Sequence, residues 1–182
     1  QRITTESGYS ECVFINDLKT SAISIYNPQE EIAFAGHAIV GASWFMGKFM
    51  NLPHNYIVCG KQKIETWFKK DCAWIRAPLS VTPTWKITQL GSNLEVEQLS
   101  PTETRKMKHT VVWAWIDEKR GIIRARTFAP DWGIPEDEAN GSGAMKLAAK
   151  LDREITVLHG KGSVIYVNPS KKDCVSLGGK VK

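Results

Sequence analysis

Short runs of apolar, β-branched and aromatic residues, separated by polar turns, dominate the first 80 residues of the 182-residue chain. Residues 12–15 and 22–26 are two such runs, and the polar turn between them predicts a β-hairpin. The segment after His37 differs, because apolar residues cover almost its whole circumference, and it predicts a buried helix. After a loop at 51–53, three more strands are expected at residues 56–59, 64–68 and 73–77.

The same order of elements returns in the second half of the chain. A strand pair at 110–116 and 121–128 precedes a helix at 143–151, and three further strands are expected at 155–158, 162–167 and 173–177. The proline-containing segment 78–85 is the best linker, and Ser100 to Glu103 predicts a capping box. The pattern ββαβββ therefore occurs twice. It predicts an α+β protein with two similar lobes, residues 1–80 and 81–182, and a ligand site in the cleft between them.

Each predicted helix follows an acidic stretch and a glycine turn. The first turn contains Gly36 and His37, and the second contains Gly141, Ser142 and Gly143. The free N–H groups of two facing helix N-termini would bind an anionic substrate from both sides. Alternatively, each glycine only supplies a positive φ angle and room for close helix packing. The recurrence of the device in equivalent places favours a ligand site.

Composition and charge exclude several classes of partner. The net charge of +5 comes from short lysine clusters, which favour solvated strand edges over a nucleic-acid surface. No run of about 18 apolar residues and no signal peptide is present, so we expect a cytoplasmic protein that does not enter a membrane. The four cysteines lack metal or redox spacing and are expected to be reduced thiols, although one disulfide pair is an open alternative.

Several catalytic motifs are absent from the sequence. It contains no phosphate-binding P-loop, no Rossmann glycine fingerprint, no Gly-x-Ser-x-Gly elbow and no His-Glu-x-x-His. The four histidines, His37, His54, His109 and His159, have no mutual ligand spacing. We therefore expect no cofactor and no metal.

Three segments are informative in combination: Tyr9 to Phe14, Glu30 to His37 and the long run from Phe128 to Ser142. Together they resemble the PhzF-like family of phenazine-biosynthesis-type isomerases. The resemblance continues through His159-Gly160, Gly162 to Val164 and Leu177 to Val181. It covers nearly the whole chain.

The resemblance implies a diaminopimelate epimerase-like fold, in which each lobe wraps a strongly curved, mostly antiparallel sheet or barrel around a central helix. It places the active site between the lobes and implies a homodimer. Glu11 matches the family's catalytic acid/base, and His37 and Asp137 match residues of its substrate pocket and are expected to be catalytic as well. The residues expected to bind a small carboxylate substrate are Gly36, Gly141, Ser142 and Gly143.

Alternatives stay open for each polar residue. A carboxyl whose pKa is raised by burial can both take and return a proton, whereas Glu11 on an edge strand could instead face solvent. His37 could donate to a substrate or bond locally at the helix start. Asp137 could stabilise the second helix, contact substrate, or do both. Glu136 and Glu138 are expected to face solvent.

The chain also departs from its relatives. Epimerases of this fold carry a cysteine at each helix start, but Ala35 and Asn140 occupy these positions here, so two-thiol racemisation is disfavoured. The first lobe lacks the family's first strand and helix, and the second is shortened around 91–109. An open sheet edge must then be covered by a partner or by other residues. We expect a cofactor-independent isomerase or epimerase that moves a proton on a small carboxylate; the competing hypothesis is a non-catalytic remnant that binds a small anion or dimerises.

Overall fold

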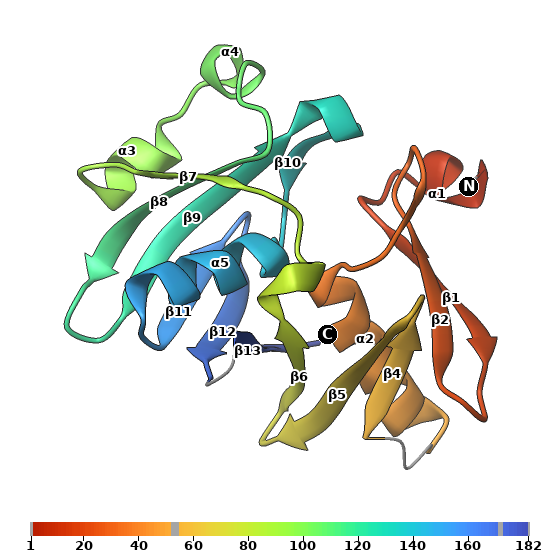
Figure 1. Ribbon diagram of the computed structural model, residues 1–182. Coiled ribbons are helices and arrows are strands. Elements are labelled where there is room, and N and C mark those ends of the chain that lie inside the picture. Colours follow the sequence, from red (N-terminus) through yellow and green to blue (C-terminus); the bar gives the residue numbers. More distant parts are fainter. Residues whose placement is uncertain (1, 52–54, 171–172, 182) are drawn as a thin grey trace.

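The computed structural model describes residues 2–51, 55–170 and 173–181, so most of the loop expected at 51–53, together with His54, lies outside the described residues. Figure 1 shows an α+β protein with few helices and one large sheet, in which most neighbouring strands are antiparallel. None of the helices in these described ranges is long and apolar enough to span a membrane.

The first half of the chain contains the expected hairpin, helix and three strands, together with a short helix and a two-residue strand that were not expected. Its elements are α1 (Arg2–Ser7), β1 (Cys12–Asp17), β2 (Ala22–Tyr26), β3 (Glu31–Ile32), α2 (Gly36–Phe49), β4 (Tyr56–Cys59), β5 (Gln62–Lys69) and β6 (Cys72–Pro78).

The second half repeats this order after an inserted segment. The insertion comprises η1 (Leu79–Val81), β7 (Lys86–Gln89), α3 (Asn93–Glu97) and α4 (Pro101–Thr104). The repeat comprises β8 (Thr110–Asp117), β9 (Ile122–Ala129), η2 (Pro130–Trp132), β10 (Ile134–Asp137), α5 (Gly141–Leu151), β11 (Ile155–His159), β12 (Ser163–Pro169) and β13 (Cys174–Lys180). The capping box is confirmed, because the Ser100 hydroxyl accepts from Glu103 N and the Glu103 carboxylate accepts from Ser100 N.

The strand order shows the repeat directly. Neighbouring strands run β1-β2-β4-β5-β6-β13-β12-β11-β9-β8-β7, so the order in the first half returns in reverse in the second. In each half the second strand of the hairpin pairs in parallel with the strand after the helix, β2 with β4 and β9 with β11. Antiparallel pairing of β6 with β13 joins the halves into one continuous sheet. β7 extends the second half beside β8, whereas β1 lies at an edge of the described sheet.

One hydrophobic core runs through both halves. Ile39 of α2 and Met145 of α5 are completely buried in it, together with Ile75 of β6. Both helices contact β13, so they meet beside the strand pair that joins the halves. The expectation that α2 is buried almost all round is wrong at its C-terminal end, where Phe45 and Phe49 are 45% and 68% exposed and stack on each other.

A smaller cluster on the opposite face of the sheet explains the inserted segment. Val96 of α3 packs with Val112, Ala114 and Phe128 of β8 and β9, and all four are buried. The short helix α3, which contacts β8 and β9, therefore covers apolar positions that would otherwise face water.

Candidate functional site

The N-termini of α2 and α5 touch, which is the arrangement expected from the two glycine turns. A methyl group placed on Gly36 would lie 3.3 Å from Cα of Gly141, and one placed on Gly141 would lie 3.2 Å from Cα of Gly36. Either methyl would also meet Leu177, at 2.5 and 2.7 Å. Neither glycine has a positive φ angle. Close approach, and not an unusual backbone conformation, therefore requires glycine at both positions.

The two helix ends differ in how they are capped. No side chain caps α2 at Ala35. In α5 the side-chain oxygen Oδ1 of Asn140 accepts a hydrogen bond from Gly143 N at 2.5 Å. Gly143 was expected to bind substrate. Its N–H group instead donates to the capping side chain, and Gly143 is not among the residues lining the adjacent cavity. The end of α2 is the better anion site, because its first N–H groups have no side-chain cap.

A cavity of about 350 Å³ lies where the two helix ends meet. Six of the seven predicted site residues line it: Glu11, Gly36, His37, Asp137, Gly141 and Ser142. The remaining wall is largely apolar, formed by Phe34, Val81, Trp85, Trp132 and Ile134. Residues far apart in the sequence thus converge on one hollow of the size that a small molecule needs.

Glu11 and His37 form an ion pair in this cavity. Oε2 of Glu11 lies 3.0 Å from Nε2 of His37, and the two side chains are 8% and 32% exposed. The alternative of a solvent-facing Glu11 is therefore wrong, although the residue directly precedes the edge strand β1. His37 comes from the first turn of α2.

The pair changes the expected protonation states. Burial raises the pKa of the Glu11 carboxyl, but the hydrogen bond and charge of His37, together with a hydrogen bond from Ser10, outweigh burial, so that this pKa lies below its ordinary value of 4.5. The expectation of a raised pKa is thus wrong, because it considered burial without a cationic partner. Burial lowers the pKa of His37, but Glu11 and the more distant Asp137 outweigh this effect and raise it to about 9. At neutral pH the pair is a carboxylate beside an imidazolium.

Asp137 holds the turn that leads into α5. Its two carboxylate oxygens accept from Ala139 N and from Nδ2 of Asn140, each at 2.9 Å, and the residue is 5% exposed. Asn140 in turn caps the helix through Gly143. Asp137 therefore combines the two roles that the sequence left open: it orders the start of the helix and lines the cavity.

Two tryptophans of the wall were missed by the sequence analysis. Nε1 of Trp85 donates to Oγ of Ser142 at 2.9 Å. Trp132 meets Trp85 edge to face, with ring centroids 5.5 Å apart, and lies 3.9 Å from the ring of His109. Trp85 ends the proline-containing linker and Trp132 lies in a short 3₁₀ helix, so no periodicity marked either residue.

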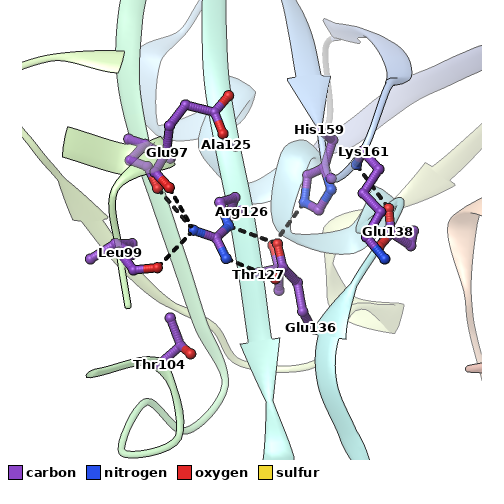
Figure 2. A network of polar contacts seen from close by, with 12 residues as sticks. Glu97, Leu99, Thr104, Ala125, Arg126, Thr127, Glu136, Glu138, His159 and Lys161 are labelled. Carbon is purple, nitrogen blue, oxygen red and sulfur yellow. Dashed lines mark hydrogen bonds and ion pairs between the residues drawn. The ribbon is translucent and has the colours of Figure 1, made fainter. Parts of the chain in front are cut away.

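A second polar network supports the segment that leads to Asp137, and Figure 2 shows its side chains. Arg126 binds both carboxylate oxygens of Glu136 at 2.7 and 2.8 Å, so Glu136 does not face solvent freely as expected. Glu138 remains half exposed and pairs with Lys161. Nε2 of the buried His159 lies 2.9 Å from the Thr127 hydroxyl, and burial lowers the pKa of this histidine. The network joins β9 and β10 just before Asp137.

Within the described residues, no group of three or more His, Cys, Asp or Glu side chains is placed to hold a metal ion. All four cysteines are free thiols. Ala35 and Asn140 stand at the two helix starts, and neither can act as a thiol acid or base.

No family model matches the chain. Several solved structures, in contrast, are similar to it. A PhzF-family phenazine biosynthesis protein from Enterococcus faecalis superimposes with a TM-score of 0.78 at 16% identity, covering 100% of this chain and 83% of that one. The PhzF-family protein of Bacillus anthracis gives 0.72 at 15%, covering 98% and 84%. This chain has the PhzF-family fold. A hydroxyproline epimerase from Agrobacterium vitis with bound trans-4-hydroxy-L-proline gives 0.53 at 11%, covering 93% and 72%.

Proposed function

We propose that the protein is an isomerase or epimerase that moves a proton on a small carboxylate substrate without a cofactor. The observation that carries this proposal is the largely buried Glu11–His37 pair, which lines a cavity of about 350 Å³ beside a helix N-terminus that no side chain caps. The fold shared with PhzF-family proteins and with a hydroxyproline epimerase supports the reaction class. It does so by analogy of fold, which is weaker support than the site itself.

The active site in this proposal lies between two lobes, residues 1–80 and 81–182. The repeated strand order supports such a division, and so does the origin of the site residues, since Glu11 and His37 come from one half and Asp137 and Ser142 from the other. A homodimer and a cytoplasmic location belong to the same proposal. Sedimentation velocity tests the first and fractionation of cells tests the second.

Glu11 acts as the acid/base. Its carboxylate takes a proton from a carbon next to the substrate carboxylate or along a conjugated system, and returns it to another position. His37 keeps Glu11 ionised and ready to accept, because the imidazolium stabilises the carboxylate. The substrate carboxylate binds the N–H groups at the start of α2, with the Ser142 hydroxyl as a further donor.

The charge of the cavity lining narrows the range of possible substrates. Glu11, Glu30, Glu31 and Asp137 line it, whereas its lining includes no lysine or arginine. If the substrate carries, besides its carboxylate, a positively charged or hydrogen-bond-donating group, that group would be attracted to these carboxylates. We therefore favour cyclic or unsaturated carboxylates that also carry an amino group.

The test is proton exchange with solvent. The protein is incubated in D₂O with a panel of cyclohexene and cyclohexadiene carboxylates, their amino derivatives, and proline and hydroxyproline, and deuterium at carbon is followed by NMR. Glu11→Gln is expected to abolish exchange and to keep ligand binding. Glu65→Gln is the matched control, because Glu65 is half exposed and pairs with Arg76 on another part of the sheet.

Binding of a panel compound without any exchange would favour the competing hypothesis of a non-catalytic anion-binding protein. Equal exchange by the wild type and Glu11→Gln would remove Glu11 from the mechanism.

A further inference from the structure

A second, larger cavity of about 840 Å³ adjoins the first. His37 and Gly141 line both cavities, so they form the wall between them. The rest of the second cavity comes from α2, β12 and β13 and from the turns before α5 and β12. Its lining includes Gly41, Ala139, Lys161 and Lys180. The side chains of the two lysines are 89% and 61% exposed, which shows that this cavity opens to water.

Glu11 itself has little access to water, although the first cavity is also open to solvent beside its exposed lining residues Glu30 and Glu31. It lines the first cavity, its side chain is 8% exposed, and its Oε2 atom is completely buried. A substrate in the first cavity would separate it further from water. Any proton that Glu11 exchanges with solvent during turnover therefore needs a carrier. Ser10 also interacts with the Glu11 carboxylate, but His37, at 3.0 Å, is the ionisable side chain in contact with it.

The two nitrogens of the His37 ring face different surroundings. Nε2 faces Glu11. Because Nε2 faces Glu11, Nδ1 is the nitrogen left for the side of the ring that lines the second cavity together with Ala139, whose backbone also helps to raise the pKa of His37. Ala139 lines the second cavity and not the first. Nε2 thus faces Glu11 and the first cavity, and Nδ1 faces the second cavity.

We propose that His37 is the port through which Glu11 exchanges protons with solvent, and that the second cavity is the water channel of this port. The inference rests on the proposed function. It assigns the second cavity a role in the reaction although no substrate enters it.

The exchange needs no further reactant than water. The Nε2–H bond of the imidazolium breaks and an O–H bond forms on Glu11, which leaves a neutral imidazole with its proton on Nδ1. A half-turn of the ring points the bare nitrogen to the second cavity, where it takes a proton from hydronium and leaves water. The Nδ1–H group now faces Glu11. The substrate-derived proton leaves by the same steps in reverse. Asp137 is the other carboxylate that stabilises the cationic ring throughout.

Gly41 allows the channel to be blocked without touching the first cavity. It lies one helical turn after His37, and a Cβ added there meets nothing within 4 Å. Side chains on a helix lean toward its N-terminus, so a leucine at this position covers the preceding turn, where His37 lies. Leucine is also a better helix former than glycine, so Gly41→Leu is expected to fold.

The experiment compares the wild type, Gly41→Leu and Gly41→Ala with a panel compound that is turned over in D₂O. Gly41→Leu is expected to keep its turnover within about twofold while deuterium incorporation per turnover falls at least fivefold, and Gly41→Ala is expected to match the wild type. Equal incorporation in all three proteins, at equal turnover, would overturn the proposed exchange of protons through His37 without contradicting the proposed isomerase function.

A second measurement needs no substrate. The exchange rate of the His37 ring protons with water is followed by NMR on ¹⁵N-histidine-labelled protein, and the resonance is assigned by its loss in His37→Gln. Gly41→Leu is expected to slow this exchange at least fivefold. An unchanged rate would overturn the inference whether or not a substrate has been found.

Discussion

The indole nitrogen of Trp85 donates a hydrogen bond of 2.9 Å to the hydroxyl oxygen of Ser142, and both side chains are more than 90% buried. This bond ties the segment between β6 and β7 to the first turn of α5. Because the Ser142 oxygen accepts from Trp85, its own hydrogen points away from the indole and stays free for another acceptor, such as a ligand in the cavity that Ser142 lines. Trp85 therefore orients Ser142 as a donor.

Replacing Trp85 by phenylalanine is expected to lower the free energy of unfolding by about 1–3 kcal/mol, because a buried acceptor loses its partner. Affinity for a bound carboxylate is expected to fall as well, since the Ser142 hydroxyl is no longer oriented. Urea titration and calorimetric binding measure the two effects. Trp67→Phe is the control, because Trp67 stacks on Trp74, away from the cavity. Equal losses of affinity in both variants would contradict the orienting role.

The Glu11–His37 pair predicts a pH dependence of stability. His37 has an ordinary pKa of 6.5 and a pKa of about 9 in the folded protein. Its stabilising contribution is therefore complete below pH 6.5 and lost as the pH rises through 9. The contribution is at most about 3 kcal/mol, because one pKa unit corresponds to about 1.4 kcal/mol and water screens a ring that is 32% exposed. Urea titrations between pH 6 and 10 measure the loss.

Glu11→Gln is the matched control for this titration. Without the carboxylate the main cause of the raised pKa is gone. Burial, which lowers the pKa of His37, is then opposed only by the smaller effects of Asp137 and the Ala139 backbone. The loss of stability between pH 6.5 and 9 is therefore expected to be much smaller than in the wild type. NMR titration of the His37 ring follows the same change directly. A His37 resonance that titrates near pH 6.5 in the wild type would show that the ion pair does not form.

Much of the fold follows from periodicity and turn chemistry. The strands of residues 22–26 and 64–68 alternate as half-buried strands do, and the glycine turns before α2 and α5 mark the repeat that the strand order contains. These signals are local. The pairing of β6 with β13, which makes one sheet of both halves, has no local signal, because any two strands of suitable pattern can pair.

The site was harder to derive. Glu11 and His37 were predicted from a resemblance, but their contact spans 26 positions and sets the pKa of both in ways that burial alone does not. Arg126 and Glu136 show the same problem, since a glutamate in an acidic run gives no sign of a buried partner. Side-chain partners depend on tertiary packing, and one sequence contains no direct record of it.

The cap of α5 gives a third prediction. Asn140→Ala removes the bonds to Gly143 N and to Asp137 and is expected to lower the free energy of unfolding by about 0.5–2 kcal/mol. Asn140→Asp keeps an acceptor for Gly143 but places a second carboxylate against Asp137. It is therefore expected to be destabilising at neutral pH, and this loss is expected to shrink in acid as the introduced carboxyl is protonated. Ser92→Ala, which uncaps the peripheral helix α3, is the control and is expected to show no such pH dependence.

The contact between the two helix ends gives the last prediction. Gly36→Ala places a methyl group 2.5 Å from Cδ2 of Leu177, and such overpacking costs about 1–3 kcal/mol of unfolding free energy. Gly41→Ala, in the same helix, meets no atom within 4 Å and is expected to gain about 0.5–1 kcal/mol from helix propensity. Leu177→Ala removes the obstructing atoms, so Gly36→Ala is expected to cost less in that background than in the wild type. A double-mutant cycle by urea titration measures the coupling. Equal costs in both backgrounds would show that Leu177 is not what forbids a side chain where the two helices meet.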